Sequence, residues 1–149
     1  MNIIEVNESV DYLKTKGVEN VEIGIILGTG LGKLVHEITD KKIIEYKEIP
    51  NFPISTVESH KGNLIQGELQ CKKVLVFQGR FHFYEGYTMN EIVFPVRVMS
   101  QLGVSKLFIC NAAGAINLEF KKGTLMLIED HIDLFPQHPL RGKNMPEWG

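Results

Sequence analysis

The chain has 149 residues, and this length predicts a single domain over residues 1–149 with a sizeable hydrophobic core. Hydrophobic residues make up 44% of the chain and charged residues 23%, which excludes a disordered protein. The net charge of -2 argues against a nucleic-acid partner, because a general nucleic-acid binder needs a basic surface. No apolar run is long enough to cross a bilayer, and the N-terminus has no basic region typical of a signal peptide. We therefore expect a cytoplasmic protein without a membrane partner.

The order of the predicted elements indicates an α/β protein. Apolar runs between turn signals predict strands at 21–27, 43–46, 64–69, 74–78, 106–110 and 124–129, with helices at 7–16 and from 88 to about 102. Thr88 and Glu91 have the spacing of a capping box at the start of the second helix, and Pro95 predicts a kink inside it. Buried strands separated by helices predict a mixed twisted β-sheet flanked by helices.

Three glycines follow the first predicted strand, in the loop of residues 28–32. With the hydroxyl of Thr29, the backbone N–H groups of such a loop form a nest that binds anions, above all phosphate. The loop does not complete a dinucleotide fingerprint, because Lys33 occupies the place of its third glycine. A purely structural glycine turn explains the same pattern equally well.

A second candidate constellation follows the strand predicted at 74–78. In an extended segment alternate side chains share a face, so Arg80, His82 and Tyr84 point one way while Phe81 points into apolar packing. Arginine can chelate two phosphate oxygens, and Glu85 is placed to hold and charge His82. The alternative is a strand end with solvated charges and a packed histidine.

Other candidate residues are less distinctive. Residues 111–115 follow a predicted buried strand, where small side chains allow either a flat ligand or a helix to approach the backbone. His60 lies in a proline-bounded loop, as a gate beside an anion site or as a surface residue. The histidines at 131 and 138, with Asp133, match no common zinc signature, so we predict no metal site. Cys71 and Cys110 form no CxxC pair and are expected to be buried, reduced thiols.

Taken together, these segments resemble the purine nucleoside phosphorylase family of the trimeric type. The matching runs are residues 28–32, 59–62, 78–87, 111–114 and 129–133, in the order of the family, and Gly79-Arg80-Phe81-His82-Phe83-Tyr84-Glu85-Gly86-Tyr87 is the most specific of them. The resemblance covers only the N-terminal part of the family's chains, which are nearly twice as long. Their later half supplies an acidic residue and an asparagine that read the purine.

The resemblance implies a nucleoside-phosphorylase-like mixed sheet, incomplete at the C-terminus, and a homotrimer for the complete protein. It implies reversible phosphorolysis of purine ribonucleosides or deoxyribonucleosides, with phosphate as co-substrate and without a cofactor. The implied catalytic residues are His82 and Glu85, and the implied phosphate contacts are Thr29, His60, Arg80, Phe81, His82 and Ala112. The implied nucleoside contacts are Tyr84, Ala113 and Gly114. The alternative is a truncated, non-catalytic remnant that binds phosphate or nucleoside.

Overall fold

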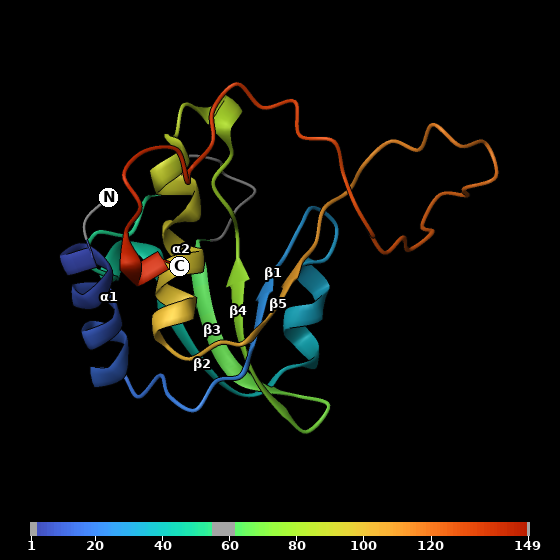
Figure 1. The fold of residues 1–149 in the computed structure, drawn as a ribbon. Coiled ribbons are helices and arrows are strands. Elements are labelled where there is room, and N and C mark those ends of the chain that lie inside the picture. The colour runs from blue at the N-terminus through green and yellow to red at the C-terminus, as the bar shows by residue number, and fades with distance from the viewer. Residues whose placement is uncertain (1–2, 55–61, 149) are drawn as a thin grey trace.

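A computed structural model describes residues 3–54 and 62–148, and their central feature is a five-stranded mixed sheet (Figure 1). The strands are β1 (Ile23–Ile26), β2 (Thr39–Glu45), β3 (Asn63–Leu69), β4 (Lys72–Gln78) and β5 (Lys106–Ile109). The α-helices are α1 (Ile3–Thr15) and α2 (Met89–Gln101), and the 3₁₀-helices are η1 (Gly32–Glu37), η2 (Tyr46–Glu48), η3 (Phe83–Glu85) and η4 (Pro146–Trp148). This architecture confirms the predicted α/β class and the mixed sheet flanked by helices.

The sheet order is β2-β3-β4-β1-β5, and the three strands at one side of it run in the same direction. Strand β1 pairs in parallel with both β4 and β5, whereas β3 is antiparallel to β2 and β4. The carboxyl ends of β1, β4 and β5 therefore meet at one edge, where ligands bind in open α/β sheets.

The predicted pairing of the third and fourth strands is confirmed, with a tight turn at Gln70 and Cys71. Both turn residues have positive φ, 49° and 59°, the backbone that matches the right-handed twist of a hairpin. The expected burial of Cys71 is wrong, because the two-residue turn places it at the exposed tip of the hairpin. Cys110, one residue beyond β5, is half-buried and not fully buried as expected, and both cysteines are free.

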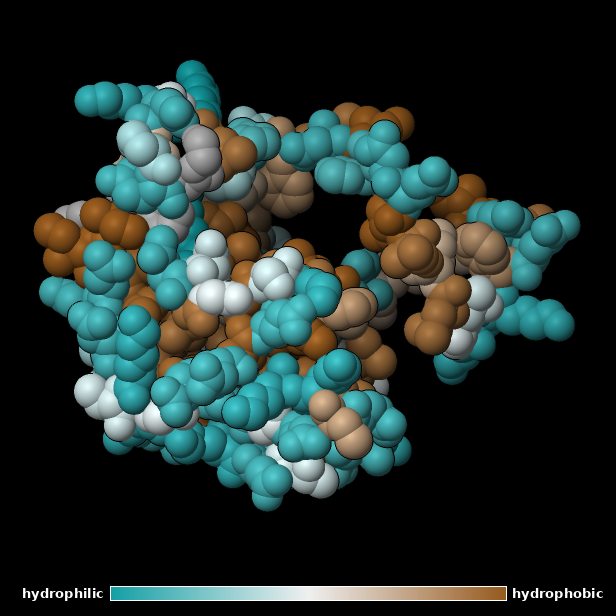
Figure 2. Space-filling view, turned by 60° about the horizontal axis from the view of Figure 1, so that its bottom comes forward, coloured by the Kyte–Doolittle hydropathy of each residue, from teal (hydrophilic) through white to brown (hydrophobic). Residues whose placement is uncertain are grey.

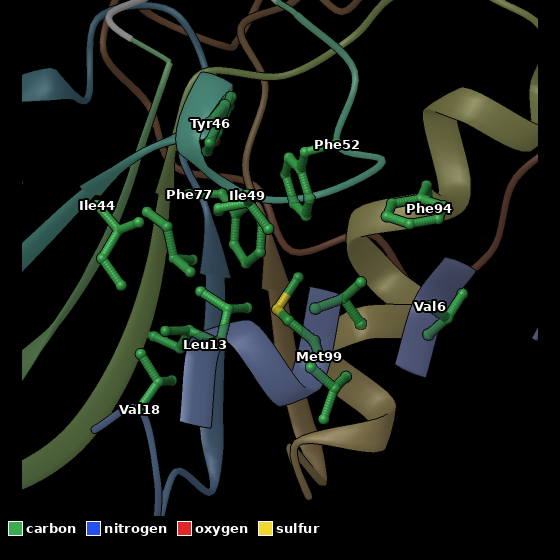
Figure 3. Close-up of a cluster of buried hydrophobic side chains, with 14 of the residues drawn as sticks. Val6, Leu13, Val18, Ile44, Tyr46, Ile49, Phe52, Phe77, Phe94 and Met99 are labelled. Carbon is green, nitrogen blue, oxygen red and sulfur yellow. The ribbon is translucent and has the colours of Figure 1, made fainter. Parts of the chain in front are cut away.

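Hydrophobic side chains alternate between the two faces of the sheet and form two core clusters. Helices α1 and α2 pack on one face, against Ile26, Leu75 and Phe77 among others (Figure 3). The η1 segment covers the other face. The N-terminus of α2 has the predicted capping box, with Thr88 and Glu91 exchanging backbone and side-chain hydrogen bonds. The helix continues through the buried Pro95, where the kink stays a prediction. No helix within residues 3–54 and 62–148 has the length and apolar character that a membrane span requires.

The prediction of a strand at 124–129 is wrong. This segment has no regular structure, and Leu125 and Leu127 are 93% and 96% exposed. It belongs to a long loop that projects beyond β5, and apolar side chains gather on that projection (Figures 1 and 2). A strand requires a backbone partner, and within the described residues β5 pairs only with β1. The apolar pattern of 124–129 is therefore not sufficient to form a strand here.

Candidate phosphate site

The parallel register brings three predicted site segments to the same edge of the sheet. Ile26 of β1 is aligned with Phe77 of β4 and with Ile109 of β5. Three residues further along each segment stand Thr29, Arg80 and Ala112. Segments that are 51 and 83 positions apart from Thr29 in the chain thus leave the sheet at the same edge, an arrangement that no local pattern specifies.

The first glycine of the 28–32 loop permits close contact between the ends of β1 and β5. A Cβ atom on Gly28 would lie 2.8 Å from the Asn111 Cα and closer still to the Cys110 carbonyl oxygen, so no larger residue fits without a backbone shift. Gly28 is buried, whereas Thr29 and Gly30 are exposed. Gly28 therefore has the structural role that the sequence allowed, and anion binding by the exposed residues after it stays a prediction.

Arg80 is held in place by two hydrogen bonds that leave part of its guanidinium available. Its Nη1 donates to the Cys110 carbonyl oxygen at 3.0 Å, and its Nε donates to His82 Nε2 at 2.8 Å. A guanidinium has five N–H donors, and the remaining ones of Arg80 have no partner among the described residues. Arg80 is thus a half-buried, preoriented cation at the end of β4.

His82 links Arg80 to the largely buried carboxylate of Glu85. Its Nδ1 contacts Glu85 Oε1, and its Nε2 accepts from Arg80. The tautomer that carries its proton on Nδ1 matches both contacts, because it donates to Glu85 and accepts from Arg80. The expected contact between His82 and Glu85 is present in the structure, and the charging of His82 by Glu85 stays a prediction.

Tyr84 completes the row that the alternation predicted. Its ring stacks on His82, with centroids 4.8 Å apart and an interplanar angle of 22°, while the residue stays 82% exposed. Arg80, His82 and Tyr84 therefore lie together as expected, although the backbone from Phe83 to Glu85 forms the 3₁₀ turn η3 in place of an extended strand. The tight turn is what brings Glu85 back to His82.

Phe81 points away from this row. Its ring is buried in the aromatic core against Tyr46, Phe52 and Tyr87. Any phosphate contact at this position would therefore come from its backbone. Sequence reasoning overlooked Tyr46, whose hydroxyl donates to the Gly79 carbonyl oxygen at 2.9 Å, because nothing local in the sequence marks that long-range bond.

A cavity of about 540 Å³ adjoins the glycine loop on the side of β4. Residues of the loop line it together with Asn63, Gln78 and Gly79, and so do Lys33 and His36 of η1. Sequence reasoning used Lys33 only to reject a dinucleotide fingerprint and did not consider His36. Both follow the loop within a few residues, which was the available signal that they lie at its cavity.

The other predicted site residues are less well defined by the structure. His60 lies outside the described residues. Ala112, Ala113 and Gly114 are exposed in the segment after β5. In the part of the chain that the structure describes, no three histidine, cysteine or acidic side chains are grouped as metal ligands would be.

These features define an α/β protein with a half-buried arginine just beyond the ends of its parallel strands. The sequence profile of the phosphorylase superfamily matches residues 22–147, and the chain belongs to this family. It is 49% identical over 144 residues to purine nucleoside phosphorylase 1 of Geobacillus stearothermophilus, covering 97% of this chain and 53% of that protein. It is 43% identical to the purine nucleoside phosphorylase of Rattus norvegicus, covering 95% of this chain and 50% of that one.

The comparison with solved structures also finds purine nucleoside phosphorylases. Isoform 2 of purine nucleoside phosphorylase from Schistosoma mansoni, in complex with cytosine and ribose-1-phosphate, matches with a TM-score of 0.76 and 48% sequence identity. The match covers 82% of this chain and 43% of that one. The chain spans about half the length of the curated relatives it matches.

Proposed function

We propose that this chain carries the phosphate half of a purine nucleoside phosphorylase active site. The reaction is reversible phosphorolysis of purine ribonucleosides or deoxyribonucleosides to the free base and (deoxy)ribose 1-phosphate. The observation that carries the proposal is the Arg80–His82–Glu85 network at the edge where β1, β4 and β5 end. The relatives named purine nucleoside phosphorylase, at 43–49% identity, support it.

In this proposal Arg80 binds the phosphate dianion with its remaining N–H donors, since arginine chelates two phosphate oxygens. The Thr29 hydroxyl and the Ala112 backbone, which follow the neighbouring strands, contribute further hydrogen bonds, and His60 and the backbone of Phe81 are additional candidate contacts. His82 Nε2 already accepts from Arg80. A direct contact between His82 and phosphate therefore requires that bond to open.

The chemistry needs an anion held beneath the sugar. Cleavage of the glycosidic bond passes through an oxocarbenium-like sugar, as in glycoside hydrolysis. Phosphate stabilises that positive charge and attacks C1′ as the C1′–N bond to the base breaks, and the base leaves with the bonding electrons. Positioning and electrostatics perform this step, so we expect neither a metal nor a cofactor to be required. Tyr84, whose ring stacks on His82, is the candidate sugar contact, and Ala113 and Gly114 are the candidates that line the base pocket.

The complete assembly belongs to the same proposal. We expect a homotrimer in the cytoplasm that serves purine salvage, by analogy with the family that the sequence resembles. The 149-residue chain alone should not turn over nucleosides measurably, because the purine-reading acid and asparagine of the family have no counterpart in it. Loss of preorganised hydrogen bonds of that kind costs roughly 10²–10³ in rate. A non-catalytic phosphate or nucleoside binder is the second candidate.

Two measurements on the purified chain test the proposal. Phosphate titration followed by calorimetry should show binding that EDTA leaves unchanged, and release of hypoxanthine from inosine and phosphate should fall far below that of a complete relative. Absence of phosphate binding contradicts the assignment of the site. Turnover within about tenfold of the complete relative would show that base recognition does not need the family's later half. Loss of binding in EDTA, restored by a divalent ion, would contradict the metal-free mechanism.

A further inference from the structure

Tyr46 is a buried tyrosine whose hydroxyl bonds to the main chain beside Arg80. It begins η2 and is 2% exposed, packed against the rings of Phe52 and Phe77 (Figure 3). Its backbone N–H donates to the Gly62 carbonyl oxygen at 2.7 Å, and this bond fixes the main chain of Tyr46. Burial raises the pKa of Tyr46, so the phenol stays protonated and remains a donor.

The hydroxyl of Tyr46 donates to the Gly79 carbonyl oxygen at 2.9 Å. Gly79 lies one residue beyond β4, where the strand ladder has ended, and its φ of 127° is a backbone conformation that other residues rarely adopt. A buried carbonyl beyond the ladder needs another partner, and Tyr46 supplies it. The bond therefore stabilises the bend by which the chain leaves the sheet.

Tyr46 also contacts the residue on the other side of Arg80. Its ring packs against Phe81, with centroids 5.7 Å apart and an interplanar angle of 46°. Gly79 and Phe81, the two neighbours of Arg80, are thus both held by one side chain, the first by a hydrogen bond and the second by ring packing. The backbone that aims the guanidinium is constrained before and after Arg80.

We propose that Tyr46 is a positioning residue that orients Arg80 for phosphate through its hydroxyl bond to Gly79. The proposal rests on the proposed function, since it assumes that Arg80 binds phosphate. Tyr46 itself does not need to touch the anion. Small displacements of a preoriented group are costly, because a misplacement of about 1 Å can reduce rates roughly 10²-fold.

The variant Tyr46→Phe isolates this role, because it keeps the ring contacts and removes only the hydroxyl. The matched control is Ser9→Ala. Ser9 is fully buried, and its Oγ donates to the Pro50 carbonyl oxygen at 2.5 Å, between α1 and the segment after η2. Both variants leave a backbone carbonyl without its side-chain donor, but only Tyr46 is bonded to the turn that precedes Arg80.

The experiment is a titration with inorganic phosphate, followed by ¹H–¹⁵N NMR, together with melting temperatures for the three proteins. We expect both variants to lower the melting temperature, Tyr46→Phe to weaken phosphate binding by about fivefold or more, and Ser9→Ala to leave binding within about twofold of the unsubstituted chain. Resonances of Gly79 and Arg80 should shift in Tyr46→Phe alone.

Three results would overturn the inference. Unchanged phosphate binding in Tyr46→Phe would show that the hydroxyl does not position Arg80. Equal weakening of phosphate binding in Ser9→Ala, or loss of folding in Tyr46→Phe, would show that Tyr46 has only a general structural role. If the unsubstituted chain does not bind phosphate, the proposed function itself fails and the inference fails with it.

Discussion

Replacing Arg80 by alanine removes the central cation of the proposed phosphate site. The guanidinium is half-buried and is held at Nη1 by the Cys110 carbonyl oxygen, 3.0 Å away, and at Nε by His82, 2.8 Å away. The donors that remain are preoriented, so little ordering is lost when they bind an anion. A hydrogen bond to a charged group contributes about 1.5–3 kcal/mol, which corresponds to roughly 10- to 150-fold in affinity. We therefore expect the dissociation constant for phosphate to rise by at least about tenfold.

The assay is phosphate titration of the purified chain by calorimetry, with melting temperatures to confirm that each variant is folded. Arg141→Ala is the matched control, because it removes the same charge from an exposed arginine in the C-terminal segment. Arg80→Lys keeps the charge but loses the planar fork, and it should bind with intermediate affinity. An unchanged affinity in Arg80→Ala, or an equal loss in Arg141→Ala, would refute the assignment of Arg80.

His82→Ala should weaken phosphate binding because Arg80 loses its Nε acceptor, and it should lower the melting temperature because the largely buried Glu85 carboxylate loses its contact with His82. Adding Glu85→Gln should restore the melting temperature without restoring phosphate binding. Normal phosphate binding by His82→Ala in a titration would favour a packed histidine. Gly28→Ala should lower the free energy of unfolding, measured in urea, by about 1–3 kcal/mol, because its Cβ would collide with the backbone of Cys110 and Asn111. Gly32→Ala is the control and should change it little, because the space around its Cβ is open. Equal effects of the two substitutions would contradict the close backbone contact at Gly28. Hydrogen bonds from Thr88 lower the pKa of Glu91 from its ordinary value of 4.5. The Glu91 carboxylate therefore stabilises the fold above pH 4.5, and this stabilisation is lost as the pH falls through the lowered pKa of the folded state. The stability difference between the unsubstituted chain and Glu91→Gln, measured by urea denaturation, should therefore disappear in acid, and a constant difference would contradict the cap.

Much of the fold could be predicted from local sequence. The capping box at Thr88 and Glu91 and the hairpin strands on either side of Cys71 follow from hydrogen-bonding patterns and periodicities that span only a few residues. The shared face of Arg80 and His82 follows likewise from alternation along the chain, whereas Tyr84 is positioned by the turn η3, which the alternation did not predict. Such features depend on neighbours in sequence, so they can be read without knowing what packs against them.

Tertiary structure decided the features that depend on distant partners. Residues 124–129 have the composition of a strand but form none, since a strand is stabilised by its neighbour and not by its own sequence. The parallel register of β1, β4 and β5 brings the segments that carry Thr29, Arg80 and Ala112 to the same edge of the sheet, although these segments are far apart in the chain. The bond from Tyr46 to Gly79 joins residues 33 positions apart. The sequence by itself determined which side chains the site has available, and the pairing of strands determined where they stand, because hydrogen bonds between distant backbone segments leave no local pattern.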